Sequence, residues 1–380
     1  MTHIFVVNEK TFKIHLEYMF AGTGYSSYEP DFIDKEKDSI ADSIEKTFVG
    51  MIADISRVRE NDLVAFYVTG CKKIFGFFKV VGEPFFMPKS INYLGEEEQL
   101  NRYLPFRIKI KPYLVFSEGI TEHQALDDIY HVDHPYEMCW SLIYRKLTGM
   151  RGCSFVTDYE SSKLNFLISL ENKNKPLVSN SYSYDSTNKR IIAIQDSLTY
   201  DCNSSNGLNI ENRLLNVSNS FEGHLQAYVM QNHDKGDLRT LLYPNSYTKS
   251  WIGNEVVCSV GEQRIDVLSI VETKEKYFVR VIELKQTTPY KEIVEIQIRW
   301  YIKWVLQYLV PFMKDKEVVI IPTIIANRFG RKSKRQTGFL SACEKFKSTR
   351  IGQLFDATIM PVEYIAFDKK ETSISFEKIF

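Results

Sequence analysis

The sequence has no excess of either charge: its 380 residues include 48 Lys and Arg and 48 Asp and Glu side chains. A chain without net charge has no overall field that attracts nucleic acid. Hydrophobic residues make up 44% of the chain and charged residues 25%, as in an ordinary globular protein. Any binding of nucleic acid must therefore depend on local basic segments.

Cysteine is scarce, and none of the six cysteines stands at the CxxC spacing of a zinc or redox motif. We expect free thiols in a reducing compartment. Long apolar runs are also absent, because charged and amide side chains interrupt residues 1–16. The most apolar helical segment, residues 298–312, contains Arg299 and Lys303 and is too short to cross a bilayer. We therefore expect a soluble, cytoplasmic protein that does not bind membranes.

Two β-branched and apolar runs, residues 264–271 and 277–286, flank a short charged segment, and this pattern predicts a β-hairpin. If the turn is centred on Lys274 and Glu275, paired positions sum to 549 and Asp266 lies directly opposite Glu283. Facing residues of adjacent strands have Cβ atoms about 5 Å apart. Lys285 is two positions beyond Glu283 and points to the same face. The hairpin alone thus brings two carboxylates and a lysine together.

Carboxylates this close repel each other and stay ionised most readily with a cation between them. Mg²⁺ suits such a site because it takes oxygen ligands and retains waters, and we expect that Mn²⁺ can substitute. A lysine beside the metal can orient or deprotonate a water. These are the groups that metal-assisted hydrolysis of a phosphodiester needs. The alternative is a solvated hairpin, but the apolar neighbours of Glu283 indicate a buried strand, where unpaired charge is costly.

The hairpin resembles the core of the PD-(D/E)XK nuclease superfamily, with Asp266 as the motif aspartate and Glu283-Leu284-Lys285 as the E-x-K. Gln297 and Tyr301 fit the Q-x-x-x-Y motif of its RecB-like and mismatch-endonuclease-like branches. The proline of the family name is absent, because Ile265 precedes Asp266.

Upstream, Phe221-Glu222-Gly223-His224-Leu225 resembles the helix that supplies the family's first glutamate, with Glu211 as an alternative. The resemblance implies a restriction-endonuclease-like α/β core with a mixed central sheet over residues 210–380. It also implies that Asp266, Glu283 and Glu222 hold the metal and that Lys285 positions the water. Gln297 and Tyr301 would support the site or touch the DNA backbone.

A basic segment follows an apolar run at residues 317–325, which predicts a central strand. A charge run is usually a solvated loop, but after a core strand of a nuclease it favours contact with phosphates, which positions DNA without reading sequence. The expected DNA-binding residues are Arg328, Arg331, Lys332, Lys334 and Arg335.

The N-terminal part contains short strands at close spacing, which predict a small β-barrel with helices. Residues 60–68, 74–80, 105–110 and 140–153 resemble the PUA-like group, in its EVE and YTH-like branch, whose members bind nucleic acid and in several cases hold a modified base. Trp140 is the first candidate for base stacking, although core packing is an equal alternative, and Tyr25 is the second.

These observations predict α/β and α+β architecture in two domains. We expect a PUA-like reader at residues 1–170, a polar linker at 171–209 and a nuclease domain at 210–380. The predicted function is a Mg²⁺-dependent endonuclease of double-stranded DNA, in a restriction system that recognises a modified base. The alternatives are a DNA-repair endonuclease that senses mismatches and a non-catalytic nucleic-acid-binding protein. Because cutting both strands requires two active sites, we expect a homodimer.

Overall fold

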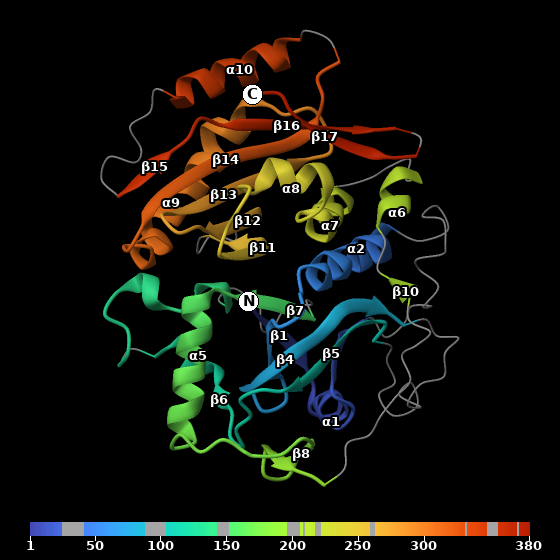
Figure 1. The fold of residues 1–380 in the computed structure, drawn as a ribbon, viewed down its shortest axis with the longest axis vertical. Coiled ribbons are helices and arrows are strands. Elements are labelled where there is room, and N and C mark those ends of the chain that lie inside the picture. Colours follow the sequence, from blue (N-terminus) through green and yellow to red (C-terminus); the bar gives the residue numbers. More distant parts are fainter. Residues whose placement is uncertain are drawn as a thin grey trace. The chain divides into compact units, whose positions relative to one another are not determined.

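The chain is mixed α/β and forms two compact units, Met1–Asn209 and Ile210–Phe380. The structure is a computed structural model (Figure 1). It describes residues 1–24, 42–87, 104–128, 130–142, 152–195, 206–207, 210–216, 222–258, 263–330, 333–347, 356–370 and 372–380.

The first unit contains a sheet of eight strands in the order β2–β5–β4–β3–β1–β7, and β6 and β10 pair with β4 outside this path. β1 and β3 are parallel, and every other pairing is antiparallel. Its strands are β1 (Thr2–Val7), β2 (Phe20–Thr23), β3 (Leu63–Val68), β4 (Lys73–Phe86), β5 (Phe106–Pro112), β6 (Ile120–Thr121), β7 (Cys153–Val156) and β10 (Asn206–Gly207).

The expected closed β-barrel is wrong for the described strands, because β2 and β7 are the two ends of an open sheet. The sheet is nevertheless strongly curved: a Cβ atom added to Gly152, next to β7, would lie 2.0 Å from Oγ1 of Thr23 in β2. The ends approach side by side without a ladder of hydrogen bonds. Short alternating strands predict a curved sheet, but they do not determine whether its edges pair.

Helices and a small hairpin surround this sheet. α1 (Glu9–Tyr18) begins after Asn8, whose side chain accepts a hydrogen bond from the Thr11 amide. α5 (Asp158–Glu171) begins with a capping box between Thr157 and Glu160. The remaining elements are α2 (Asp42–Ser56), α4 (Glu122–Leu126), η3 (Pro135–Glu137), η4 (Trp140–Leu142), β8 (Tyr182–Asp185) and β9 (Arg190–Ala193).

Residues 171–209, where we expected a linker, belong to the first compact unit. The β8–β9 hairpin packs on α1, with the Tyr184 ring edge-on to Phe12 at 5.1 Å and a hydrogen bond of 2.6 Å from Ser183 Oγ to Glu17. The described part of this segment is therefore ordered against the unit, although its composition is polar.

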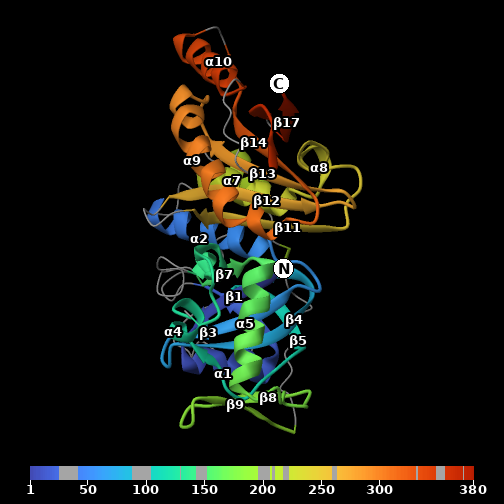
Figure 2. The same ribbon diagram turned by 90° about the vertical axis from the view of Figure 1, so that its left-hand side faces the viewer.

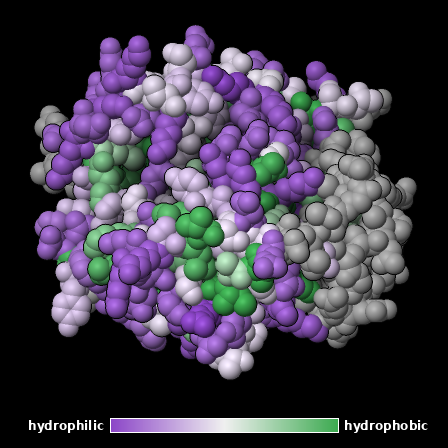
Figure 3. Space-filling model, turned by 60° about the horizontal axis from the view of Figure 1, so that its bottom comes forward, coloured by the Kyte–Doolittle hydropathy of each residue, from purple (hydrophilic) through white to green (hydrophobic). Residues whose placement is uncertain are grey.

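The surface of the molecule carries exposed hydrophobic side chains among hydrophilic ones. Figure 3 shows hydrophobic residues gathered near the middle of one face and surrounded by hydrophilic residues. In the first unit the exposed apolar side chains include Phe166 and Leu170, one turn apart on α5.

The second unit contains a mixed sheet, as expected, in the order β11–β12–β13–β14–β16–β17 with β15 on β14. β13, β14 and β16 are parallel neighbours, whereas β11, β12 and β13 form an antiparallel meander. The strands are β11 (Lys249–Val257), β12 (Arg264–Glu272), β13 (Lys276–Lys285), β14 (Glu317–Asn327), β15 (Ala357–Ile359), β16 (Glu363–Lys369) and β17 (Ile374–Lys378).

Helices cover both faces of this sheet, and Figures 1 and 2 show α8 and α9 on opposite sides of it. β14 is almost entirely buried, as its apolar sequence predicts. The helices are α6 (Glu211–Asn216), α7 (Glu222–Asn232), α8 (Gly236–Leu242), the π-helix η5 (Ile293–Ile298), α9 (Arg299–Tyr308), η6 (Val310–Phe312) and α10 (Lys334–Lys347).

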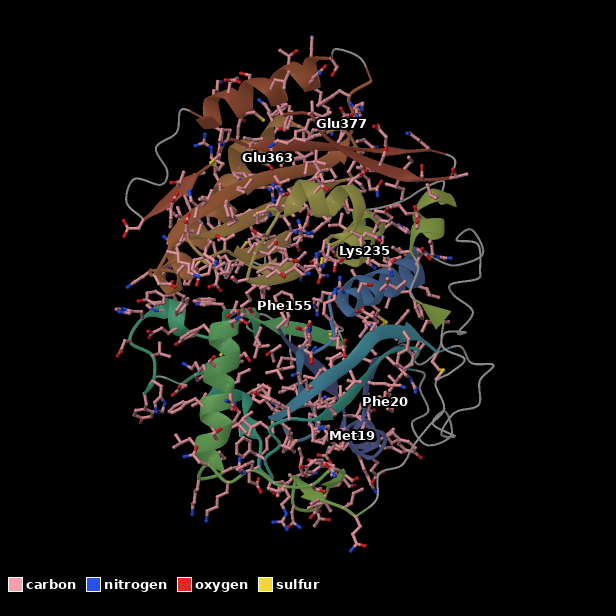
Figure 4. The ribbon with its side chains drawn as sticks, viewed as in Figure 1. Met19, Phe20, Phe155, Lys235, Glu363 and Glu377 are labelled. Carbon is pink, nitrogen blue, oxygen red and sulfur yellow. The ribbon has the colours of Figure 1, made fainter. Side chains whose placement is uncertain are left out.

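A buried arginine links three strands of this sheet to the end of α8. Arg280 in β13 donates to the Leu242 carbonyl at the end of α8, to Thr323 in β14 and to Glu363 in β16. Glu363 and Glu377 lie on the paired strands β16 and β17 (Figure 4). These hydrogen bonds connect β13, β14, β16 and α8. They give the β12–β13 hairpin, which contains Arg280, a rigid support.

Candidate active site

The β12–β13 hairpin has the register that the sequence predicts. Val267 pairs with Ile282 and Leu268 with Val281, so paired positions sum to 549. The same register places Asp266 opposite Glu283 at the end of the ladder. The turn closes where the Thr273 amide donates to the Lys276 carbonyl at 2.9 Å.

Asp266 is held by the neighbouring strand. Its Oδ2 accepts a hydrogen bond of 2.8 Å from the amide of Leu284, inside the E-x-K tripeptide. Oδ1 has no hydrogen-bond partner among the residues that the structure describes. Burial, followed by repulsion from Glu283, raises the pKa of Asp266 well above its ordinary value. A cation bound beside Asp266 would therefore stabilise its charged form.

Lys285 is the counter-ion of this site. Its Nζ lies 2.9 Å from Oε1 of Glu283 and 3.0 Å from Oε2 of Glu222. Glu283 is 2% exposed, whereas Glu222, the first residue of α7, is half exposed. Sequence positions 222, 283 and 285 thus converge, and Glu222 rather than Glu211 is the glutamate that reaches Lys285.

Charge, more than burial, determines the protonation of Lys285. Burial alone would lower its pKa, but the carboxylates of Glu283 and Asp266 outweigh burial and hold the pKa above its ordinary value. Burial also raises the pKa of Glu283, and Lys285 offsets part of that rise. The neighbouring carboxylates thus favour the protonated form of Lys285, which can orient a water and stabilise negative charge.

The Q-x-x-x-Y residues come from a helix that begins as a π-helix and continues as α9. Tyr301 is 4% exposed, and burial followed by the charge of Glu283 raises the pKa of its hydroxyl. The Gln297 Oε1 atom is buried without a hydrogen-bond partner in the described part of the chain. π-Helical turns are frequent at functional sites because they redirect side chains by one position.

The carboxylate oxygens of the site provide some, but not all, of the ligands that a hard divalent cation needs. Two carboxylates, Asp266 and Glu283, lie on facing positions, and Oε2 of Glu283 is buried and makes no hydrogen bond to the described residues. Such an acceptor is costly to leave unpaired, and a cation would satisfy it. However, the described residues contain no group of three or more His, Cys, Asp and Glu side chains arranged to hold a metal. Glu222 binds Lys285 instead of completing a three-carboxylate cluster.

Three polar residues that the sequence did not single out surround Asp266. Gln226 is buried on α7, and its Nε2 donates to the Asp266 carbonyl at 3.1 Å and to Glu255 Oε1 at 3.2 Å. Asn254 Nδ2 lies 3.5 Å from Gln226 Oε1. The only sequence signal for Gln226 is its position one helical turn after Glu222, and none marks Glu255.

The basic segment is partly used within the protein. Arg328 pairs with Asp368 at 3.0 Å and with Glu377 at 2.5 Å. Arg335 donates to the carbonyls of Thr288 and Pro289 and lies 5.3 Å from the centre of the Tyr290 ring. These two arginines anchor the segment at its ends, beside the loop that follows Lys285.

The remaining basic residues have different positions. Lys334 is exposed at the start of α10. Arg331 and Lys332 lie outside the described residues. Three of the five residues predicted to contact phosphate lie in the described ranges. Of these three, Lys334 is the one whose charge is not paired with another described residue.

The candidate base-recognition residues lie in the first unit. Trp140 is half buried in η4, and its Nε1 donates to the Pro135 carbonyl at 2.7 Å. Lys163 and Glu160 of α5 hold this loop through the Glu137 carbonyl and the Ser141 amide. Trp140 is thus held on a loop that α5 supports. Tyr25 lies outside the described residues.

Comparison with protein-family models, with curated proteins and with solved structures finds no significant match for this chain. No helix within the described ranges is long and apolar enough to cross a membrane. Five of the six cysteines lie in the described ranges, and all five are free thiols.

Proposed function

We propose that the protein is a Mg²⁺-dependent DNA endonuclease whose active site is the Asp266, Glu283 and Lys285 cluster of the second unit. The observation that carries the proposal is the position of the buried Lys285 ammonium group, which binds both Glu222 and Glu283, while Glu283 faces Asp266 across the hairpin. Nζ of Lys285 lies 2.9 Å from Glu283 and 3.0 Å from Glu222. The resemblance of these residues to the PD-(D/E)XK nucleases supports the same reaction.

Asp266 and Glu283 would hold the metal, the former through its unpaired Oδ1 and the latter through Oε2. When bound, Mg²⁺ supplies a polarised water and neutralises charge on the phosphate. Mn²⁺ would substitute for it. Leu284 orients the Asp266 carboxylate through its amide, at 2.8 Å from Oδ2.

Lys285, held protonated by its carboxylate neighbours, would orient the attacking water and stabilise the developing negative charge on the phosphate. Glu222 holds Lys285 from the N-terminus of α7. Tyr301 is buried and lies against Glu283, and Gln297 would support the site from the preceding helical turn. The proton of the attacking water would leave to solvent or to a phosphate oxygen.

The proposed substrate is double-stranded DNA carrying a modified base, which the first unit would read through Trp140. Trp140 is half buried on a loop that α5 supports, and stacking of a base on its ring would contribute about 1–3 kcal/mol. The protein would then be a restriction enzyme acting as a homodimer. Recognition of a mismatch, as in a repair endonuclease, would use the same stacking surface and differs in the duplex that is preferred.

The test is a digest of unmodified, methylated, hydroxymethylated and mismatched DNA with Mg²⁺ or Mn²⁺, using the full chain and Asp266→Asn as the control. We expect metal-dependent cleavage by the wild type, with preference for one modified duplex, and none by the variant. Preference for mismatched DNA would change the assignment from restriction to repair. Absence of cleavage and of nicking on all four substrates with both metals would overturn the nuclease proposal.

A further inference from the structure

Glu255 has a backbone conformation that is unfavourable for a residue with a Cβ atom. It lies within β11, and its φ is +52°, in the left-handed region that L-residues other than Gly, Asn and Asp rarely adopt. The flanking pairs Asn254↔Val267 and Val256↔Ile265 place Glu255 directly opposite Asp266. Glu255 lies within a strand, so turn geometry does not explain its strained backbone. Strained residues of this kind cluster at functional sites.

Gln226 connects Glu255 with Asp266. Its Nε2 donates to both the Asp266 carbonyl and Oε1 of Glu255, while its Oε1 faces the Asn254 amide. A side-chain amide has two N–H donors, and both are used on acceptors. The Asp266 carbonyl and the ionised Glu255 carboxylate can only accept, so together they determine which way round the Gln226 amide points.

Asp266 is consequently held at two points. Gln226 fixes its main-chain carbonyl from α7, and Leu284 fixes its carboxylate from β13. Arg264 lies 3.0 Å from Oε2 of Glu255 and holds that carboxylate in place. The contacts link β11, α7 and β12 around one residue.

We propose that Gln226 and Glu255 are positioning residues for Asp266: the Gln226 amide fixes the Asp266 main chain, and Glu255 fixes the orientation of that amide. The inference rests on the proposed function, because it takes Asp266 as a ligand of a divalent cation. Groups that orient a metal ligand typically contribute about 10- to 100-fold to metal affinity.

Two substitutions at one position separate strain from positioning. Glu255→Gly removes the side chain and adopts φ +52° without steric cost, so its thermal unfolding midpoint should not fall below that of the wild type. Glu255→Gln keeps an acceptor of the same length. With Mn²⁺ as the probe, we expect Glu255→Gly to bind about 10- to 100-fold more weakly and Glu255→Gln to stay within about threefold of wild type.

Hydrogen exchange gives a second readout that does not depend on catalysis or metal. The Leu284 amide is bonded to Asp266, so its exchange in the metal-free full chain reports on the position of that carboxylate. We expect faster exchange of the peptide containing Leu284 in Glu255→Gly and in Gln226→Met, and unchanged exchange in Glu255→Gln.

Wild-type exchange and wild-type Mn²⁺ affinity in Glu255→Gly would overturn the positioning role. Equal loss in Glu255→Gly and Glu255→Gln would also overturn it, because charge rather than an oriented acceptor would then be required. If the wild type itself neither binds Mn²⁺ nor cleaves DNA, the proposed function fails, and the exchange comparison still decides whether Glu255 and Gln226 position Asp266.

Discussion

Among the described residues, the Glu283 carboxylate forms an ion pair with one cation, Lys285. Lys285 therefore contributes to the stability of the fold and, in the proposed mechanism, to cleavage. Glu283 is 2% exposed, so loss of Lys285 leaves a carboxylate in the interior without a counter-ion. Lys285→Met should lower the free energy of unfolding by roughly 3 kcal/mol. It should also lower cleavage at least about 10²-fold, while DNA binding is retained.

The double variant Lys285→Met with Glu283→Gln tests the contribution of Lys285 to stability. Removing both charges should restore most of the free energy of unfolding, measured by urea denaturation, and cleavage stays low because Glu283 is itself a proposed metal ligand. A double variant no more stable than Lys285→Met would contradict the assignment of the stability loss to the unpaired Glu283 carboxylate.

His15 gives the first unit a sensitivity to acid that does not involve the nuclease site. It is fully buried, its Nδ1 bonds to the Phe20 carbonyl at 2.8 Å, and burial followed by the charge of Arg107 lowers its pKa to about 3. Because the folded state disfavours the charged ring, its contribution to stability is complete above the unfolded pKa near 6.5. That contribution is lost as the pH falls towards 3, by roughly 2 kcal/mol at pH 5.

His15→Asn keeps a donor near the Nδ1 position and does not titrate. Its free energy of unfolding should therefore fall less steeply than that of the wild type between pH 6.5 and pH 5. His123→Asn, at an exposed histidine, is the control and should follow the wild-type curve. Parallel curves for all three proteins would contradict the assignment of the acid sensitivity to His15.

At the scale of elements, the basic segment of residues 328–335, which ends in the first turn of α10, contains residues of two kinds. Arg328 and Arg335 bind other parts of the protein, whereas Lys334 forms no ion pair with the described residues. Lys334→Ala should weaken DNA binding and reduce the slope of log affinity against log salt by about 1, as expected for one lost phosphate contact. Arg328→Ala should leave this slope nearly unchanged, because Asp368 and Glu377 already neutralise the guanidinium group. The measurement is a titration of labelled duplex at several salt concentrations. A larger slope change for Arg328→Ala would reverse the roles of the two residues.

The sequence predicts the hairpin of the site well because a short turn determines its register. Once Lys274 and Glu275 are taken as the centre, the positions of Asp266, Glu283 and Lys285 follow from strand geometry. The pattern also predicts that Gln297 and Tyr301 lie on a helix, although the sequence did not indicate that residues 293–298 form a π-helix. Local patterns of this kind need no knowledge of distant contacts.

The sequence does not predict features that depend on distant pairing. Glu255 faces Asp266 only because β11 pairs with β12, and its left-handed conformation has no signal in an ordinary strand sequence. The ion pairs of Arg328 join it to Asp368 and Glu377, which lie 40 and 49 positions later in the chain. The barrel prediction was wrong for a similar reason, because edge pairing between β2 and β7 is a property of the whole sheet.

At the scale of the whole molecule, residues 171–209, for which the composition predicts a linker, belong to the first compact unit, and the second unit begins at Ile210. The β8–β9 hairpin packs on α1, and β10 pairs with the end of β4 at Phe85 and Phe86. A fragment of residues 1–209 should therefore unfold at a higher temperature than a fragment of residues 1–170, as measured by circular dichroism. A fragment of residues 210–380 contains every proposed nuclease residue and should retain metal-dependent, unselective cleavage. Equal stability of the two N-terminal fragments would show that residues 171–209 are only a linker.

The order in which the second unit folds follows from its hairpin. β12 and β13 are joined by a short turn, and a hairpin of this kind forms within about 1–10 μs. The parallel pairing of β13 with β14 joins Lys276 to Glu317 and requires closure of a longer loop, so it should come later. Asp266 and Glu283 therefore meet before the rest of the sheet surrounds them, and their repulsion opposes the first step of assembly. Asp266→Asn should accordingly speed refolding in a stopped-flow experiment more than it slows unfolding. A divalent cation present while the chain is synthesised would have the same effect, acting on the rate of assembly before any DNA is bound.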